Sequence, residues 1–141
     1  MTPQNFFEKL DQRVKEIGSL LCVGLDPHPS DLTAPSAEAA RTFCQRLIKA
    51  TAPYAAAFKQ NAAFFESYGA HGWTVLKEII SAVQEESQRL GSMIPVILDA
   101  KRGDIASTAE AYARSAYEQL GAQAYVIPGI PILGEIGHVF I

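Results

Sequence analysis

The sequence has no surplus of positive charge and no long apolar run, and both absences exclude classes of function. Its 141 residues include 12 basic and 15 acidic side chains, which give a net charge of -3. The basic residues are interspersed with acidic ones, so we expect no nucleic-acid partner bound through its phosphates. There is no stretch of about 20 apolar residues and no signal-peptide pattern, and we therefore expect a cytoplasmic protein without a membrane partner.

Cysteine, histidine and glycine also lack the spacings that mark common sites. Cys22 and Cys44 are the only cysteines and form no CxxC pair, so we expect two reduced, mostly buried thiols. The 3 histidines show no ligand spacing such as HExxH, and the glycines form neither GxGxxG nor a P-loop. The sequence therefore predicts no metal site, and it contains neither of these two nucleotide-binding motifs.

What the sequence does contain is a regular alternation of short apolar runs and segments with helical periodicity. The runs predict strands at 20–25, 54–58, 94–98 and about 122–127. The periodicity predicts helices at 6–17, about 37–51, 73–90 and about 107–120, the last opened by a capping box at 107–110 and ended by Gly121. Repeated strand and helix units imply an α/β fold with a parallel sheet covered on both faces.

The first predicted helix is amphipathic. Its apolar stripe consists of Phe6, Phe7, Leu10, Val14 and Ile17. Charged residues, Arg13 among them, fill the opposite face of the helix.

Charged side chains stand at the carboxyl ends of three predicted strands. Asp26 follows the first strand, Lys59 the second, and Asp99, Lys101 and Asp104 the third. Taken singly, each of these charged residues is common in loops, and an aspartate after a strand often caps the next helix. Three strands ending in this way favour a catalytic cluster, because scattered surface charge has no reason to collect there. Residues two apart on a strand share a face, so Asp99 and Lys101 are expected to point the same way, with a turn at 103 bringing Asp104 back.

Three polar residues beside these charges are assigned to other roles. Arg102 alternates with Asp99 and Lys101, so we predict that it points away from them and has a structural or surface role. Gln60 and Asn61 follow the second predicted strand and are interpreted as loop residues.

Three motifs, taken together, resemble orotidine 5'-phosphate decarboxylases. They are Val23-Gly24-Leu25-Asp26-Pro27, Phe58-Lys59-Gln60-Asn61 and Asp99-Ala100-Lys101-Arg102-Gly103-Asp104-Ile105. The resemblance covers about residues 5–124, and the stretch 99–113 points to the longer bacterial type of the family. It implies a (β/α)8 TIM barrel with its active site at the carboxyl ends of the strands, of which this chain holds about the first four βα units.

The resemblance also implies a reaction and the residues that perform it. Lys59, Asp99, Lys101 and Asp104 would form an alternating charged network that decarboxylates orotidine 5'-monophosphate to uridine 5'-monophosphate. Lys101 would donate the proton to the carbanion left at C6, and no cofactor would be needed.

Substrate binding and assembly follow from the same resemblance. Asp26 would bind the ribose hydroxyls of the small-molecule substrate. The family residues that match Asp104 and Thr108 reach into the neighbouring subunit's site, so Thr108 is assigned to substrate binding and a homodimer is implied.

The resemblance weakens from Tyr125 onward, and the length is short for the fold. A barrel of this type has about 250 residues, so we expect residues 1–141 to be a single domain, the N-terminal part of a barrel, with 125–141 departing from the family pattern. The family's pyrimidine and phosphate contacts lie in the second half of the barrel. We therefore expect this chain alone to turn over the substrate poorly or not at all.

Two other interpretations stay open at this stage. Asp-x-Lys-x-x-Asp also occurs in metal-dependent enzymes of the same barrel superfamily that act on sugar phosphates, and a Mg²⁺ requirement would favour that class. The third interpretation is a non-catalytic half-barrel fragment that persists by assembling with itself or with a partner.

Overall fold

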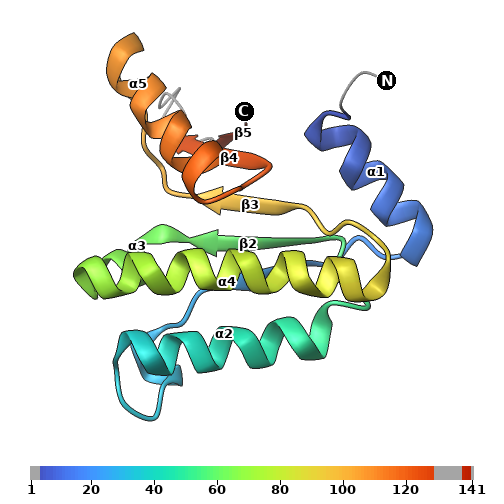
Figure 1. The fold of residues 1–141 in the computed structure, drawn as a ribbon, viewed down its shortest axis with the longest axis horizontal. Helices are drawn as coiled ribbons and strands as arrows, with labels where there is room; N and C mark the ends of the chain where they lie inside the picture. The colour runs from blue at the N-terminus through green and yellow to red at the C-terminus, as the bar shows by residue number, and fades with distance from the viewer. Residues whose placement is uncertain (1–3, 129–137, 141) are drawn as a thin grey trace, which may run out of the picture.

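The computed structural model describes residues 4–128 and 138–140, which form a single sheet flanked by helices (Figure 1). The strands are β1 (Cys22–Leu25), β2 (Ala57–Asn61), β3 (Val96–Asp99), β4 (Ala124–Pro128) and β5 (His138–Phe140), in that spatial order. Strands β1 to β4 pair in parallel, whereas β5 pairs antiparallel with β4. The predicted parallel sheet of four strands is confirmed.

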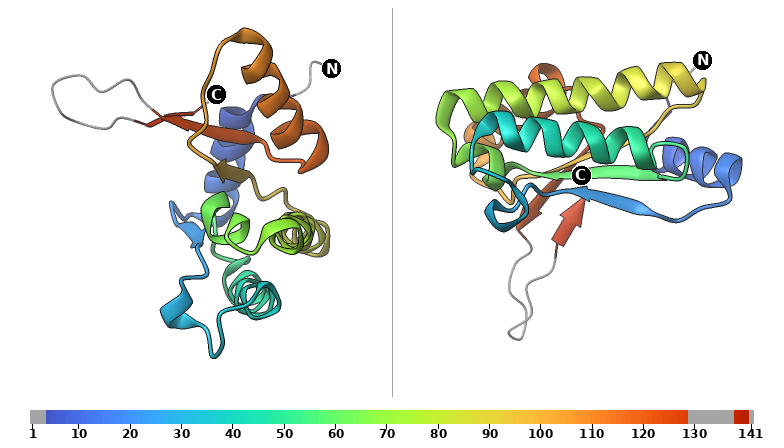
Figure 2. Two further views of the ribbon diagram at one scale, coloured as in Figure 1. Left: turned by 90° about the vertical axis from the view of Figure 1, so that its left-hand side faces the viewer. Right: turned by 90° about the horizontal axis from the view of Figure 1, so that it is seen from below.

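The helices cover both faces of this sheet (Figure 1, Figure 2). They are α1 (Phe6–Ile17), the 3-10 turn η1 (Pro29–Asp31), α2 (Ala37–Thr51), α3 (Ala62–Glu66), α4 (Gly69–Leu90), α5 (Ala106–Ala113) and the π-helical segment η2 (Arg114–Gln119). Helices α2 and α4 pack side by side along one face of the sheet. Helix α1 packs against the other face.

The position of β2 differs from the sequence prediction. The apolar run at 54–58 predicts the strand there, but it runs from Ala57 to Asn61. The N–H groups at positions 54 and 55 both donate to the carbonyl of Thr51 at 2.9 Å, so this part of the run closes the turn after α2. Gln60 and Asn61 therefore belong to the strand, and their interpretation as loop residues is wrong.

The start of α5 also corrects a prediction. The expected capping box at 107–110 does not form, because the helix already begins at Ala106 and Ser107 lies inside it. Ile105 is the N-cap residue and contributes no side-chain cap; the carboxylate of Asp104 accepts the Ile105 N–H at 2.7 Å. At the other end, Gly121 has a φ of +75° just after η2, which confirms it as the stop.

The core lies between the sheet and the helices α2, α4 and η2. Its largest fully buried side chains are Leu25, Ile48, Phe58, Phe65, Leu76, Ile79, Ile80, Ile94 and Leu98. Helices α3 and α4 approach closely at Gly72, where an added Cβ would stand 1.7 Å from the carbonyl oxygen of Phe65. Backbone contact at that distance leaves room for glycine alone.

A second, smaller cluster lies on the opposite face of the sheet. It contains Ala57, Ile97, Ala124 and Val126, and Phe6 and Leu10 of α1 pack against it. Part of the apolar stripe of the first helix, Phe6 and Leu10, thus faces the sheet, whereas Phe7 is 66% exposed. In the described part of the chain, β1 pairs with β2 alone, so the other edge of β1 carries unpaired backbone groups.

The two cysteines are both free, as predicted, but they differ in burial. Cys44 on α2 is buried, whereas Cys22 at the start of the edge strand β1 is exposed. The expectation of two buried thiols is thus half wrong, because nothing in the described chain covers that edge. No helix within the described residues is long and apolar enough to cross a membrane.

Arg13 is the charged residue whose position the sequence predicts least well. Although it lies on the charged side of the α1 pattern, it is only 3% exposed. Its guanidinium donates to the carbonyl oxygens of Ala52 at 2.7 Å and Ala55 at 3.1 Å, and to Ser92 Oγ at 2.8 Å. Burial lowers the pKa of Arg13, while the charge of Glu16 raises it. Arg13 thus ties α1 to the segments that precede β2 and β3.

We expect Arg13→Met to destabilise the chain by about 2 to 3 kcal/mol, because two buried carbonyl groups lose charged donors. Equilibrium unfolding in urea measures the change. Lys15→Met is the matched control from the same helix, since Lys15 pairs with Asp11 on the exposed face and its loss should change stability far less. Equal losses in the two variants would contradict the anchoring role of Arg13.

Candidate active site

Four charged residues meet at the carboxyl ends of β1, β2 and β3, and we call them the charged cluster: Asp26, Lys59, Asp99 and Lys101. Lys59 Nζ lies 3.7 Å from Asp26 Oδ2 and 3.2 Å from Asp99 Oδ2. Lys101 Nζ donates to both Asp99 oxygens, at 2.6 and 2.7 Å. The charges alternate in sign along the row, so each has an opposite partner.

The topology of the sheet brings these residues together. Asp26 directly follows β1, Lys59 lies inside β2, and Asp99 is the last residue of β3. Parallel pairing places Gly24 beside Lys59 and Asn61 beside Asp99. Because all three strands run the same way, their polar ends share one edge of the sheet.

Asp99 is the centre of the charged cluster and its most buried member, at 6% exposed. Burial by itself would raise the pKa of Asp99, but the hydrogen bonds and positive charges of Lys101 and Lys59 together outweigh it, and the pKa is lowered. The carboxylate therefore stays ionised at neutral pH. It holds two ammonium groups on the same side of the sheet.

Lys101 reaches Asp99 by an unusual backbone path. Strand β3 ends at Asp99, and Lys101 has a φ of +51°, the only positive φ outside glycine in the described chain. Its N–H donates to the carbonyl of Val126 at 2.9 Å. Asp99 and Lys101 thus share a face as predicted, although through a left-handed turn and not through a continued strand.

Asp26 is held by the neighbouring strand. Its Oδ1 accepts the N–H of Asn61 at 3.2 Å, and Oδ2 faces Lys59. The Asn61 side chain meanwhile caps α3 by accepting the N–H of Ala63 at 3.2 Å. Asp26 remains partly exposed, so its carboxylate can accept further hydrogen bonds from a ligand at this edge.

Comparison with known proteins identifies the family of the chain. The sequence model of the orotidine 5'-phosphate decarboxylase / HUMPS family matches residues 19–133. The chain belongs to this family. An orotidine 5'-phosphate decarboxylase of Roseiflexus castenholzii is 47% identical over 134 residues, which are 93% of this chain and 46% of that protein. The chain thus spans about half the length of the curated relatives it matches.

Solved structures place the fold within the same family. The OMP decarboxylase of Leishmania donovani superposes with a TM-score of 0.72 at 53% identity, covering 86% of this chain and 43% of that one. The UMP synthase of the same organism gives a TM-score of 0.73 at 53% identity, covering 87% of this chain and 24% of that one. The OMP decarboxylase neighbours are TIM barrels, so the fold of this chain is part of a (β/α)8 barrel, as predicted.

Two residues that the resemblance assigns to the site lie outside the charged cluster. Asp104 is exposed, and no lysine or arginine among the described residues pairs with it, because its carboxylate caps the Ile105 N–H instead. The expected turn that returns Asp104 to Lys101 is therefore not seen in the single chain. Thr108 lies in the first turn of α5, and its N–H donates to the carbonyl of Ile105 at 3.0 Å. Their assigned roles in this decarboxylase family member stay predictions.

Arg102 contacts α3 and α4, the helices on the α2–α4 face, and Gln60 alternates along β2 with Lys59. Arg102 forms an ion pair with Glu66, in agreement with the structural role predicted for it. Gln60 is fully buried, and neither polar atom of its amide has a partner in the described chain. Sequence reasoning missed this burial because it placed the strand three residues too early. No set of three histidine, cysteine, aspartate or glutamate side chains in the described ranges could hold a metal ion.

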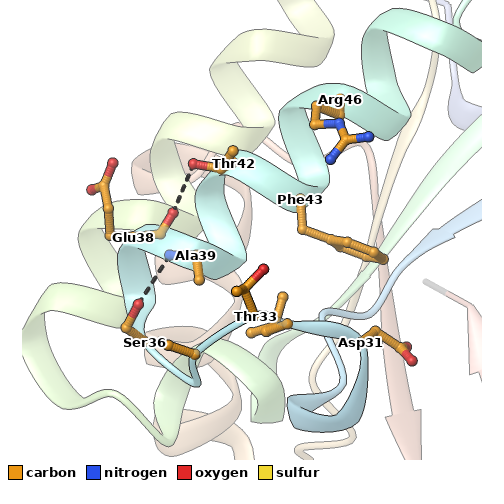
Figure 3. Close-up of a pocket in the computed structure, with 10 residues that line it drawn as sticks. Asp31, Thr33, Ser36, Glu38, Ala39, Thr42, Phe43 and Arg46 are labelled. Carbon is orange, nitrogen blue, oxygen red and sulfur yellow. Dashed lines mark hydrogen bonds between the residues drawn. The ribbon is translucent and has the colours of Figure 1, made fainter.

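The hollow beside the N-terminal end of α2 is a separate feature of the surface (Figure 3). It measures about 330 Å³ and lies between residues 31–34 and the helix, with Phe43 and Arg46 on its wall. Two of its polar groups are already used locally: Ser36 Oγ accepts the N–H of Ala39, and Thr42 donates to the carbonyl of Glu38, both at 3.1 Å. No member of the charged cluster lines it.

The lowered pKa of Asp99 predicts how stability depends on pH. A carboxyl group whose pKa is lower in the folded state stabilises the fold above its unfolded pKa of about 4, and this contribution is lost as the pH falls through the folded value. Asp99→Asn should therefore be less stable than the parent chain at pH 7, by about 1 kcal/mol. The difference should shrink as the pH falls below about 4.

Urea unfolding at a series of pH values measures this dependence. Asp11→Asn is the matched control, because Asp11 pairs with Lys15 on an exposed helix face and its loss should leave a much smaller difference at every pH. A difference for Asp99→Asn that does not change between pH 7 and pH 3 would contradict an ionised, doubly paired Asp99.

Proposed function

We propose that this chain supplies the charged half of the active site of an enzyme that decarboxylates orotidine 5'-monophosphate to uridine 5'-monophosphate. The observation that carries the proposal is that one buried carboxylate, Asp99, forms ion pairs with two ammonium groups at the carboxyl edge of a parallel sheet. Membership of the decarboxylase family supports the same reaction. The proposal concerns the chain within a complete barrel, since it spans about half the length of its relatives.

The chemistry needs such a cluster. Loss of CO2 from C6 of the pyrimidine leaves an electron pair on carbon with no adjacent group to take it up. A cation fixed beside C6 stabilises that charge as it develops, without reorganising during the reaction. Lys101 is the cation we assign to this position, and its ammonium then protonates C6.

The other members of the charged cluster support Lys101. Asp99 accepts from Lys101 through both oxygens, which orients the ammonium and favours its charged form. Lys59 neutralises Asp99 from the other side and links it to Asp26. We assign Asp26 to the ribose hydroxyls, because it is a partly exposed acceptor at the same edge.

Assembly, location and cofactor use form the second part of the proposal. Asp104 directly precedes the N-cap residue Ile105, Thr108 lies in the first turn of α5, and Asp104 forms no ion pair with the charged cluster of its own chain. We propose that they complete the site of a second subunit in a cytoplasmic homodimer. The reaction would need no cofactor, because the lysines provide both the charge and the proton.

A fused barrel tests the function. Residues 1–124 of this chain would be joined to the part of the Roseiflexus castenholzii enzyme that lies beyond the position matching residue 124; the two proteins are 47% identical over 134 aligned residues. We expect the fused barrel to form uridine 5'-monophosphate with a turnover number in the ordinary range of about 1 to 10³ per second. Loss of orotidine 5'-monophosphate absorbance and chromatography of the product measure it.

Two controls make the test decisive. The intact Roseiflexus castenholzii enzyme fixes the assay, and EDTA should leave the rate of the fused barrel unchanged. A fused barrel that unfolds cooperatively but forms no product would overturn the proposal. A rate that requires Mg²⁺ would favour a metal-dependent enzyme of the same barrel superfamily instead.

A further inference from the structure

The segment that carries Lys101 must be held in place, because its backbone conformation is unfavourable. Lys101 is the one described residue other than glycine with a positive φ. A side chain with a Cβ adopts this region at a cost, and persists there only when the surroundings hold it. On one side Asp99 holds the ammonium group, and the Lys101 N–H is bound to Val126. The next residue along the chain provides a further anchor.

Arg102 is fixed by side chains from three different helices. It forms an ion pair with Glu66 at the end of α3. Its guanidinium carbon lies 5.5 Å from the ring centre of Trp73 on α4 and 5.6 Å from that of Tyr112 on α5. A guanidinium offers both a planar face for aromatic rings and a fork for a carboxylate, and a lysine ammonium does not.

The anchor joins the two lysine-bearing segments of the charged cluster. Helix α3 begins directly after β2, the strand that contains Lys59, and Glu66 is its last residue. Arg102 directly follows Lys101. The ion pair between Arg102 and Glu66 therefore ties the segments of the two lysines together through side chains other than the lysines themselves.

We propose that Arg102 is a positioning residue that holds the left-handed backbone at Lys101, and thereby keeps the Lys101 ammonium on Asp99. Its ion pair and ring contacts involve helix residues and no member of the charged cluster, so Arg102 acts through the peptide that it shares with Lys101. The expected effect of Arg102 on kcat rests on the proposed decarboxylase function. Its expected effect on the backbone at Lys101 rests on the contacts of Arg102 alone.

The structural part is tested in the full 141-residue chain by amide hydrogen exchange. In Arg102→Met the Lys101 N–H, bound to Val126 in the parent, should exchange about tenfold faster or more, because its local opening becomes easier. Arg102→Lys should behave like the methionine variant, since it lacks the planar face. Glu66→Gln is a milder variant that serves if Arg102→Met does not fold. It should also accelerate exchange of the Lys101 N–H.

The control removes an arginine ion pair that lies within a single helix, away from the Lys101 segment. Arg89 pairs with Glu86 on the same helix at 2.6 Å, and Arg89→Met should leave the exchange of the Lys101 amide unchanged. An Arg102→Met chain in which this amide exchanges as in the parent would overturn the proposal. Equal acceleration at all core amides of β3 and α4 would overturn it as well, because that result reports general destabilisation.

The kinetic part uses the fused barrel. Arg102→Met should lower kcat by about tenfold to a hundredfold and change KM far less, because a displaced proton donor slows chemistry and not binding. Arg89→Met should leave both constants unchanged. A rise in KM with kcat intact would overturn the positioning role. If the parent fused barrel is inactive, the proposed function fails, and the exchange data still decide the structural role of Arg102.

Discussion

Replacing Lys101 with alanine in the fused barrel is expected to lower kcat/KM for orotidine 5'-monophosphate by about 10⁴-fold or more. Two contributions are lost together: a proton donor at C6, worth about 10² to 10⁴, and a fixed cation beside the developing carbanion, worth about 10² to 10³. The ammonium is already held by both oxygens of Asp99 before any substrate binds. Water could not replace a charge that is fixed in this way.

The fold should survive this change, because the Lys101 side chain is 44% exposed and buries little apolar surface. Circular dichroism and urea unfolding check that the variant is intact. Lys77→Ala, on the exposed side of α4, is the control and should keep full activity. A decrease of less than tenfold in the Lys101 variant would show that another group donates the proton.

Lys59→Met in the fused barrel is expected to lower kcat/KM by about 10² to 10³, the range observed when one fixed electrostatic donor is removed. Lys59 is the link between Asp26 and Asp99, at 3.7 and 3.2 Å. Without it, Asp99 keeps a single cationic partner and Asp26 loses its own. Both carboxylates would then face the substrate without neutralisation, and its binding and its chemistry should suffer together.

The pattern of kinetic constants separates Lys59 from Lys101. We expect Lys59→Met to raise KM as well as lower kcat, because Asp26 is assigned to the ribose. Lys101→Ala should act mainly on kcat. Lys49→Met, near the end of α2, is the control for a lost surface lysine. Unchanged constants in Lys59→Met would remove Lys59 from the proposed site.

Much of the fold could be predicted because it is built from repeated strand and helix units. Helix α2 runs from Ala37 to Thr51, as its periodicity indicates, and the strands β1, β3 and β4 lie within the predicted apolar runs or extend them by one residue. The exception is β2, where Tyr54 and Ala55 are apolar enough to look like strand but close a turn. Local sequence cannot distinguish a strand from a turn here, because the bounds of β2 are set by its pairing with β1 and β3.

The charged cluster was predictable for the same reason. Asp26, Lys59 and Asp99 need only the rule that parallel strands end at a common edge, and the structure brings them together there. The position of Asp104 could not be obtained in this way. It depends on whether its carboxylate meets a lysine or caps Ile105, and in the described chain it accepts the Ile105 N–H.

By itself, the sequence determined the class of fold, the edge of the sheet where the charges gather and the four members of the charged cluster, to which it wrongly added Asp104 within the single chain. These properties follow from local periodicity and strand direction, which neighbouring residues encode. The tertiary structure alone decided that Arg13 is buried, that Lys101 adopts a left-handed backbone and that Arg102 has three partners. Each of these depends on atoms brought together from distant parts of the chain, and no pattern within one segment specifies them.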